Sequence, residues 1–204
     1  MQITDGRRRR GATSRGTALE SAARIARADG IEGLTFGRVA SDAGMAKSSL
    51  QVLFEDREKL QLQTLDYSVE QFASRVVEAV GKSSVAQSQP LYRLCSAWFQ
   101  VMSSSECPGG CLLTAALSEY RGKDGLIPVA IRAHQQRWAD ALRKAAEAGI
   151  VSGEIPPSSD INQLIFEIQA IQAAANVVAA ANDESGLSRA RKAICNIIDR
   201  VCTP

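Results

Sequence analysis

The feature that most limits the fold of this chain is the segment Thr35 to Phe54, which reads TFGRVASDAGMAKSSLQVLF. Two helices that cross closely need a small residue at the crossing, and Ala40 supplies one. Gly44, four residues later, can adopt the positive φ of a tight turn, and Leu50 returns an apolar side chain to the crossing. The remaining inward positions are also small or apolar: Val39, Ala43, Met45 and Leu53. This spacing predicts a helix-turn-helix, although an ordinary pair of helices joined by a glycine turn shares it.

Two features outside that spacing favour a DNA-binding motif. The outward positions near the start of the second helix are short or polar, and can donate to phosphates or read base edges: Lys47, Ser48, Ser49 and Gln51. Residues 1–16 contain five arginines and a single acid, Asp5, in a chain whose net charge is only +2. Such a basic arm indicates an anionic polymer partner, although a disordered solubilising tail has the same composition.

Apolar residues recur at helical spacing through the rest of the chain, and no sustained strand-like alternation interrupts them. The pattern predicts an all-α fold with about nine helices. We expect these at residues 17–29, 36–43, 47–54, 57–80, 90–102, 112–120, 128–148, 160–181 and 187–201.

Composition excludes several other classes of protein. Hydrophobic residues make up 45% of the chain, which is enough for a real core. No apolar run approaches the roughly 20 residues of a membrane span, and no apolar stretch follows the N-terminal arginines as in a secretory signal. We therefore expect a cytoplasmic protein without a membrane partner. Its five cysteines, an odd number, are expected to be free thiols.

The residues that could carry catalysis or hold a metal are few. Cys107 and Cys111 flank a Pro-Gly-Gly turn and could form a redox pair, half of a metal site, or only a loop. Zinc needs about four N or S ligands, and the one histidine, His134, is distant in sequence. His134 lies on an apolar helix face, which favours a core or pocket-lining role over that of a catalytic base. We expect no enzyme activity, no metal and no cofactor.

Three stretches within residues 17–65 resemble the DNA-binding domain of the TetR (tetracycline-repressor) family. Gly30 to Thr35 (GIEGLT) is similar to the stretch before the family's second helix. Ala43 to Leu50 (AGMAKSSL) is similar to the family's AGVSKGTL. Phe54 to Leu60 (FEDREKL) is similar to FxSKEEL, which leads into the family's long fourth helix.

The resemblance implies three parts. Residues 1–16 are a basic N-terminal arm, residues 17–62 a three-helix helix-turn-helix DNA-binding domain, and residues 63–204 a helical ligand-binding and dimerisation domain. The family usually has two aromatics and a histidine where this chain has Gln51, Val52 and Leu53. Gln51 would then donate to the DNA backbone or read adenine. The expected DNA contacts are Arg10, Thr35, Arg38, Lys47, Ser48, Ser49, Gln51 and Lys59.

The C-terminal half, from Gly109 onward, resembles one subgroup of the family's C-terminal domains less specifically. That resemblance implies a ligand cavity among the fourth to eighth helices and a dimer made by the last two. Large flexible and aromatic side chains on the cavity helices suit an apolar or aromatic ligand, although core packing explains any single one. The expected ligand-binding residues are Phe72, Trp98, Phe99, Met102, His134, Trp138, Phe166 and Gln169. The last two helices are apolar on more than one side, which predicts a second partner face at Ile168, Ala175, Ile194, Ile197, Ile198 and Val201.

Together these patterns predict a sequence-specific DNA-binding transcriptional regulator. It would bind a pseudo-palindromic operator of double-stranded DNA as a homodimer, and a small hydrophobic or aromatic effector would release it. One alternative keeps the DNA binding and replaces the ligand with a thiol switch at Cys107 and Cys111. Another is a helical carrier or enzyme for small hydrophobic molecules, in which the helix-turn-helix is only structural.

Overall fold

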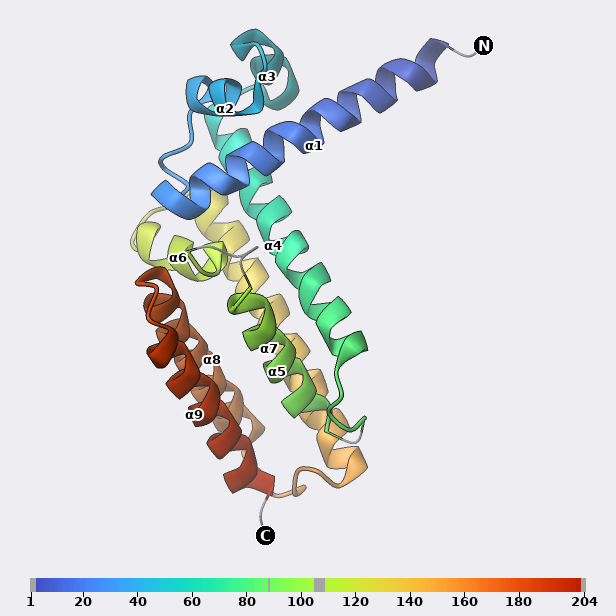
Figure 1. The fold of residues 1–204 in the computed structure, drawn as a ribbon, viewed down its shortest axis with the longest axis vertical. Helices are drawn as coiled ribbons and strands as arrows, with labels where there is room; N and C mark the ends of the chain where they lie inside the picture. Colours follow the sequence, from blue (N-terminus) through green and yellow to red (C-terminus); the bar gives the residue numbers. More distant parts are fainter. Residues whose placement is uncertain (1–2, 88, 105–108, 203–204) are drawn as a thin grey trace.

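The computed structural model describes residues 3–87, 89–104 and 109–202. These residues form nine α-helices and no strand, so the predicted all-helical fold is confirmed. The helices are α1 (Ile3–Asp29), α2 (Phe36–Ala43), α3 (Lys47–Phe54), α4 (Arg57–Lys82), α5 (Pro90–Met102), α6 (Leu112–Glu119), α7 (Leu126–Ser152), α8 (Ile161–Ala180) and α9 (Glu184–Cys202). Figure 1 shows α2 and α3 at one end, α4 running to the opposite end, and α8 beside α9 along the body.

The N-terminal arm is not a separate extended segment. Helix α1 begins at Ile3 instead of near Thr17, so the basic residues continue the helix and project beyond the head (Figure 1). The run contains no proline that would stop a helix, and arginine is a good helix former. The basic segment is therefore presented as a helix continuous with the DNA-binding head.

Local capping explains why α2, α3 and α4 start and stop where they do. The Thr35 side chain accepts from the backbone N–H of Arg38 at 3.2 Å, and the Asp56 side chain accepts from that of Lys59 at 2.8 Å. Gly44 ends α2 with a φ of +62°, the left-handed conformation predicted for the turn. Helix α3 begins after Ala46 without a side-chain cap. The turn and both caps are thus local consequences of the sequence.

Two hydrophobic cores hold the molecule together, and they do not separate at residue 62. The head core contains the inward residues of α1 to α3, and it also includes side chains from α6 and the start of α7: Leu112, Ala116, Tyr120, Ile127 and Ile131. The body core joins α4, α5, α7, α8 and α9. The expected boundary between residues 62 and 63 lies inside the continuous helix α4. The head is therefore packed directly onto the body.

Candidate functional site: a DNA-reading head and an internal cavity

The start of α3 presents the residues predicted to read DNA. Lys47, Ser48, Ser49 and Gln51 are all exposed, whereas Leu50 between them is fully buried in the head core. No described residue forms an ion pair with Lys47. Because these groups are hydrated in the free protein, DNA phosphates or base edges could replace water without breaking an internal contact.

The other predicted DNA contacts are already engaged within the head. Arg38 forms an ion pair with Asp29 and donates to the carbonyl oxygen of Gly33 at 3.0 Å. Lys59 pairs with Glu55, and this contact raises the pKa of Lys59. Thr35 is exposed, but its hydroxyl caps α2. A phosphate would have to compete with these partners. The Arg10 side chain lies outside the described ones, although its backbone belongs to α1.

Arg15, which contributed to the predicted basic arm, has a structural role. Its guanidinium donates to the carbonyl oxygen of Leu53 at 2.5 Å and to the side chain of Gln63. The same group lies over the Phe54 ring, 5.0 Å from its centroid. Arg15 therefore clamps α1 onto the end of α3 and the start of α4.

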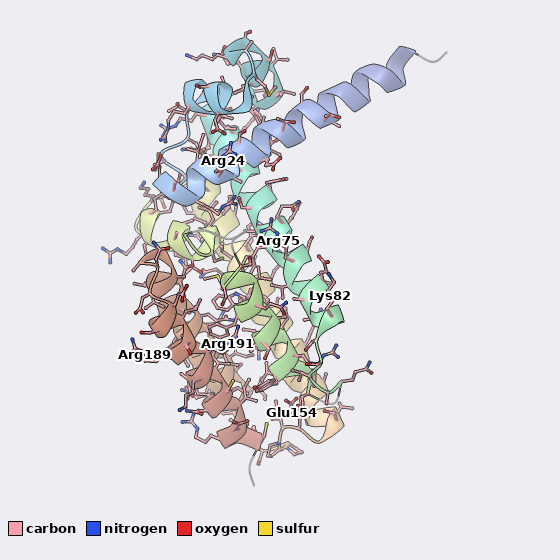
Figure 2. All side chains as sticks on the ribbon, in the orientation of Figure 1. Arg24, Arg75, Lys82, Glu154, Arg189 and Arg191 are labelled. Atoms are coloured by element: carbon pink, nitrogen blue, oxygen red, sulfur yellow. The ribbon has the colours of Figure 1, made fainter. Side chains whose placement is uncertain are left out.

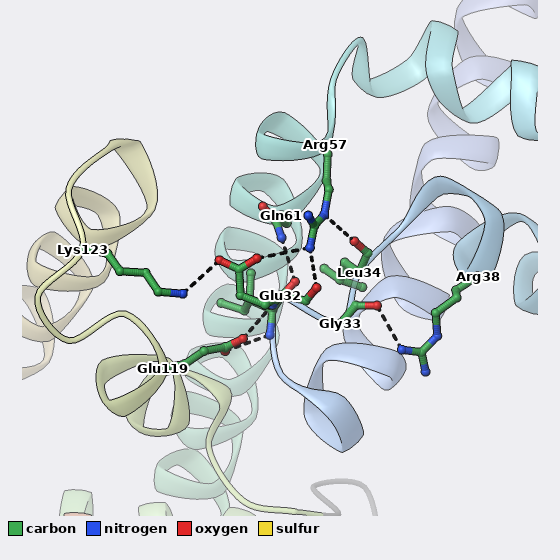
Figure 3. A network of polar contacts seen from close by, with 9 residues as sticks. Glu32, Gly33, Leu34, Arg38, Arg57, Gln61, Glu119 and Lys123 are labelled. Carbon is green, nitrogen blue, oxygen red and sulfur yellow. Dashed lines mark hydrogen bonds and ion pairs between the residues drawn. The ribbon is translucent and has the colours of Figure 1, made fainter.

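A polar junction ties the α1–α2 loop to the body (Figure 3). The Glu119 carboxylate at the end of α6 accepts from the backbone N–H groups of Ile31 at 2.9 Å and Glu32 at 2.6 Å. A Cβ on Gly30, whose φ is +79°, would lie 2.7 Å from the Glu119 Oε1 atom. Lys123 donates to Glu32 at 3.1 Å and lowers its pKa. Close packing and charge thus connect the head to α6.

Helix α4 strengthens the same junction from the other side. Gln61 donates to the carbonyl oxygen of Ile31 at 3.0 Å, and the Arg57 Nε donates to that of Leu34 at 2.8 Å. Sequence reasoning identified neither residue, nor Glu119. Glu119 is 88 residues from Ile31 along the chain, so no local pattern signals the contact.

The body contains a cavity of about 560 Å³, within the range of small-molecule sites. Its wall is formed by residues of α1, α4, α5, α6, α7 and α8 together with Gly110 and Cys111. The predicted ligand-binding residues that belong to the wall are Phe72, Trp98, His134, Trp138 and Gln169.

The other three predicted ligand-binding residues lie elsewhere. Phe99 follows Trp98 by one residue, and this rotation along α5 turns it to the side where Arg191 of α9 covers its ring. Met102 is buried in the body core but is not part of the cavity wall. Phe166 is 66% exposed on the outer side of α8. Phe166 is not part of the cavity wall, although Gln169 and Ala173 of the same helix are.

His134 is held by partners on both sides of its ring. The Arg137 guanidinium donates to Nδ1 at 2.6 Å, and Nε2 lies 2.6 Å from a carboxylate oxygen of Asp66. Arginine can only donate, so Nδ1 accepts and Nε2 carries the proton that Asp66 accepts. Both ring nitrogens are thus used by protein partners. His134 therefore links α4 to α7 in the cavity wall and has no ring nitrogen left for catalysis.

Three polar atoms in cavity-wall residues are shielded from solvent and have no hydrogen-bond partner among the residues that the structure describes. They are the amide nitrogen of Gln172, the hydroxyl of Ser68 and the Nε of Arg27. The Trp138 Nε1 donates to the Gln172 Oε1 at 2.8 Å. Because the indole N–H can only donate, this bond fixes the amide orientation and leaves the Gln172 NH₂ as the unpaired group.

Four of the six predicted dimer residues are buried inside the protomer, whereas Ile197 and Val201 keep partial exposure. Ile168, Ala175, Ile194 and Ile198 are buried inside the protomer's own body core, because α8 and α9 pack their apolar faces against each other and the other helices. Ile197 and Val201 are half-buried and also pack on that core. These residues stabilise the protomer. The exposed apolar side chains of α8 are instead Phe166 and, at 69% exposure, Val177.

Between Phe166 and Val177 the outer side of α8 carries the small exposed residues Ala170 and Ala174. Within the described part of the chain, α8 is the one helix long and apolar enough, by length and composition alone, to cross a membrane. The core helix of a soluble protein can pass the same test. Polar residues interrupt its sequence: Glu167 is half-buried, and Gln172 and Asn176 are buried within the protomer. Helix α8 thus has one apolar side packed in the core and a second that is exposed at Phe166 and Val177.

The cysteines give no support to a reactive pair or a metal site. Cys107 lies outside the described residues. Burial raises the pKa of the Cys111 thiol and also that of Cys95, which disfavours the reactive thiolate. Among the residues that the structure describes, no group of three or more His, Cys, Asp or Glu side chains could hold a metal ion.

Comparisons with known proteins agree with this architecture. A family model for the tetracyclin repressor-like C-terminal domain matches residues 88–194, slightly more than half of the chain. No curated protein sequence matches. A TetR-family transcriptional regulator from Cytophaga hutchinsonii is similar in structure, with a TM-score of 0.84 at 16% identity over 96% of this chain and 98% of that one.

A second similar structure is a TetR transcriptional regulator from Chloroflexus aurantiacus. It has a TM-score of 0.82 at 23% identity, over 94% of this chain and 97% of that one. Such likenesses show a shared fold across nearly the whole chain, and the family model adds the sequence evidence. The chain belongs to the TetR family of transcriptional regulators.

Proposed function

We propose that this DNA-binding regulator is a repressor that a small apolar or aromatic ligand releases from its operator. The recognition helix α3 would enter the major groove through Lys47, Ser48, Ser49 and Gln51, which are exposed at its start. The helical basic arm of α1 would add contacts to phosphates or the minor groove. Arg38 and Lys59 would contribute less, because each would have to leave an internal ion pair.

The observation that carries the ligand response is that α1 belongs to both sites. Its residues Ala18, Ala22 and Ala26 pack in the head core, whereas Glu20, Ala23 and Arg27 are part of the cavity wall. A molecule in the cavity would therefore press on the helix that supports the recognition helix. Glu119 and its partners would transmit movements of α6 to the same end of α1.

Release from DNA also requires a difference in affinity between two states. A ligand shifts the position of the heads only if it binds the DNA-incompetent arrangement better than the DNA-bound one. The shared wall offers such a difference, because any change in the angle of α1 changes the shape of the cavity. The same coupling acts in both directions, so operator DNA would weaken ligand binding by the factor by which ligand weakens DNA binding.

A homodimer would present two recognition helices to the two halves of a pseudo-palindromic operator. The outer side of α8, with Phe166, Val177 and the alanines between them, is the apolar face that a second copy would cover. Large apolar side chains at the two ends and small ones between them allow two helices to approach closely. We place the protein in the cytoplasm, where an operator is accessible.

Selection of bound fragments from a genomic DNA pool tests this function. We expect a salt-sensitive consensus with two related half-sites about one helical turn, or a multiple of it, apart. Placing the recovered operator in front of a reporter gene then distinguishes repression from activation. A protein that recovers no consensus at low salt, while remaining folded, is not a sequence-specific regulator.

A further inference from the structure

In the cavity wall, Arg27 of α1 and Gln172 of α8 have donors near the head that are unpaired among the described residues, and the aromatic residues Phe72 and Trp98 lie further along the body. From this arrangement we infer that the effector is an amphipathic anion: a carboxylate, held by Arg27 and Gln172 at the head end, attached to an aromatic or aliphatic body. The inference deepens the proposed function, since it names the chemistry of the ligand for that same cavity.

The first support is the nature of the unpaired atoms. Gln172 is 5% and Ser68 8% exposed, and both belong to the cavity wall. The Gln172 NH₂ and the Arg27 Nε–H can only donate, and the Ser68 hydroxyl can donate as well. Buried polar groups in folded proteins nearly always have partners, and bulk water does not reach these three. The missing partner is a hydrogen-bond acceptor, which a ligand would supply once these side chains turn toward the cavity.

The second support is that Arg27 and Gln172 lie at the same end. A Cβ on Gly109 would meet the Arg27 carbonyl oxygen at 3.1 Å. Two residues later the Cys111 N–H donates to the Asn176 side chain at 2.5 Å, and Asn176 is one turn of α8 beyond Gln172. One short segment thus touches both neighbourhoods. On this basis we place the carboxylate between the two side chains, with one oxygen for each donor.

The third support is the apolar character of the other end. On α4, Ser68 precedes Phe72 and Val76, and the helix runs away from the head (Figure 1). The Phe72 and Trp98 rings meet edge to face with centroids 6.3 Å apart. Leu94, one helical turn before Trp98 on α5, extends this apolar surface. The body of the ligand would lie here.

Charge selects an anion over a neutral acceptor. The acids in the wall, Glu20 and Glu70, are exposed, whereas Arg27 and Arg75 are half-buried. No described residue forms an ion pair or a hydrogen bond with the Arg27 side chain. A carboxylate matches a guanidinium in charge and in planar geometry.

Matched acids and amides test the inference directly. Both tryptophans of the chain, Trp98 and Trp138, line the cavity, so intrinsic fluorescence reports binding without DNA. The probes are 3-phenylpropionate, 1-naphthaleneacetate and decanoate, each against its primary amide. We expect at least one acid to bind about tenfold or more tightly than its amide, since one charge-assisted hydrogen bond separates them.

Two variants locate the carboxylate. Arg27→Gln should bring the acid's affinity down to that of its amide. Gln172→Glu keeps an acceptor for Trp138 but replaces the free NH₂ by a charged oxygen, so it should weaken the acid about tenfold or more and spare the amide. Arg24→Gln is the control, because Arg24 is exposed on the same helix, pairs with Asp42 and is not part of the wall (Figure 2).

Equal affinities for acid and amide overturn the inference, as does an acid preference that survives in Arg27→Gln. Absence of a fluorescence change with every acid, in protein that circular dichroism shows to be folded, overturns it too. The proposed function fails separately. An acid that binds through Arg27 but never displaces operator DNA leaves the inference standing and removes the ligand-released repressor.

Discussion

The head and the body of this protein leave polar groups without protein partners in different places. On α3, Lys47 and Gln51 are exposed, and water satisfies them until DNA replaces it. In the body, the Gln172 amide nitrogen and the Ser68 hydroxyl are buried beside a cavity without a partner among the described residues. Exchange of water for DNA contributes about 1 kcal/mol per hydrogen bond, whereas an unmade buried one costs about 1–3 kcal/mol. The exposed groups of α3 therefore need no ligand in the free protein, whereas a ligand that pairs with Gln172 or Ser68 would remove a cost.

Because of this difference, substitutions in the two parts should have different effects on folding. Substitutions on the α3 surface should alter DNA binding and leave folding intact. Substitutions in the cavity wall or the junction should alter stability and function together. The following tests are ordered by the size of their expected effect.

The largest effect should come from substitutions on the outer side of α8. If this side forms the dimer interface, it lets two DNA-binding heads bind one operator together. Phe166→Glu combined with Val177→Glu should dissociate the dimer and lower operator affinity about 100-fold or more, because one head alone loses the advantage of linked half-sites. Analytical ultracentrifugation and gel shift measure both. Val151→Glu, an equally conspicuous exposed valine at the end of α7, should remain dimeric. A dimeric double variant would place the interface on another face.

A lysine that already forms an ion pair within the head should contribute less to DNA affinity than a lysine without an ion pair. Lys47→Ala should weaken binding to all sequences by roughly tenfold at low salt and reduce the salt slope by about 1. Lys59→Ala should have a smaller effect, because Glu55 already neutralises Lys59. Titrations of both variants at several salt concentrations decide this. Equal losses would mean that the Glu55 pair opens on the DNA.

Base reading is expected at Gln51. Gln51→Ala should relax preference at one or two base positions, a loss of about 1–3 kcal/mol of discrimination, and leave stability unchanged because the side chain is exposed. Repeating the DNA selection with the variant gives the answer. An intact consensus would assign Gln51 to the DNA backbone, or to no contact at all.

The junction joins the two parts, so its loss should make them independent. In Glu119→Gln the amide can accept from only one of the two N–H groups of Ile31 and Glu32, which should destabilise the protein by about 1–3 kcal/mol. Operator affinity should change only a few-fold, but an effector that binds the cavity should displace DNA less effectively. Thermal unfolding and ligand-dependent gel shift separate these effects. A variant with a full ligand response would show that α1 alone carries the coupling.

These contacts also show why the sequence predicts the head better than the body. Thr35, Gly44 and Asp56 act within four residues of themselves, through caps and a turn, so their types and spacing suffice. Long-range packing determines the roles of Glu119, Gln172 and Arg27. The residues next to them in the sequence do not predict these roles.

Helices that are apolar on more than one side limit prediction from the sequence in a second way. The composition of α8 predicts two apolar sides but not which residues face the protomer core, so the sequence alone assigns Ile168 and Ala175 to the dimer and Phe166 to the cavity. In the structure Ile168 and Ala175 are buried in the protomer core, and Phe166 is exposed and outside the cavity wall. Periodicity gives the angle between residues on a helix, but only tertiary packing gives the direction of each side.

The smallest expected effect concerns individual acidic groups, because paired acids and the buried Glu154 respond to pH in opposite directions. In the head, Arg24 lowers the pKa of Asp42 and Lys123 lowers that of Glu32. Their pairs contribute stability above the unfolded-state pKa of about 4, and this is lost as the pH falls. Both acids are exposed, so the contribution is small.

In the body, burial raises the pKa of Glu154, which lies at the end far from the head (Figure 2). A raised pKa means that the folded protein favours the protonated acid. Its contribution to stability is therefore complete below about pH 4.5 and is lost as the pH rises through the folded-state value. Glu154→Gln keeps the shape of the protonated acid without the charge. Its melting temperature relative to the natural protein should consequently be higher at pH 7 than at pH 4.5. Glu147→Gln, which changes an exposed acid of α7, should show no such trend across the same range. If both variants follow the same pH dependence, burial of Glu154 has no measurable influence on folding. Glu154 would then not differ from the ion-paired acids Asp42 and Glu32 in its effect on stability.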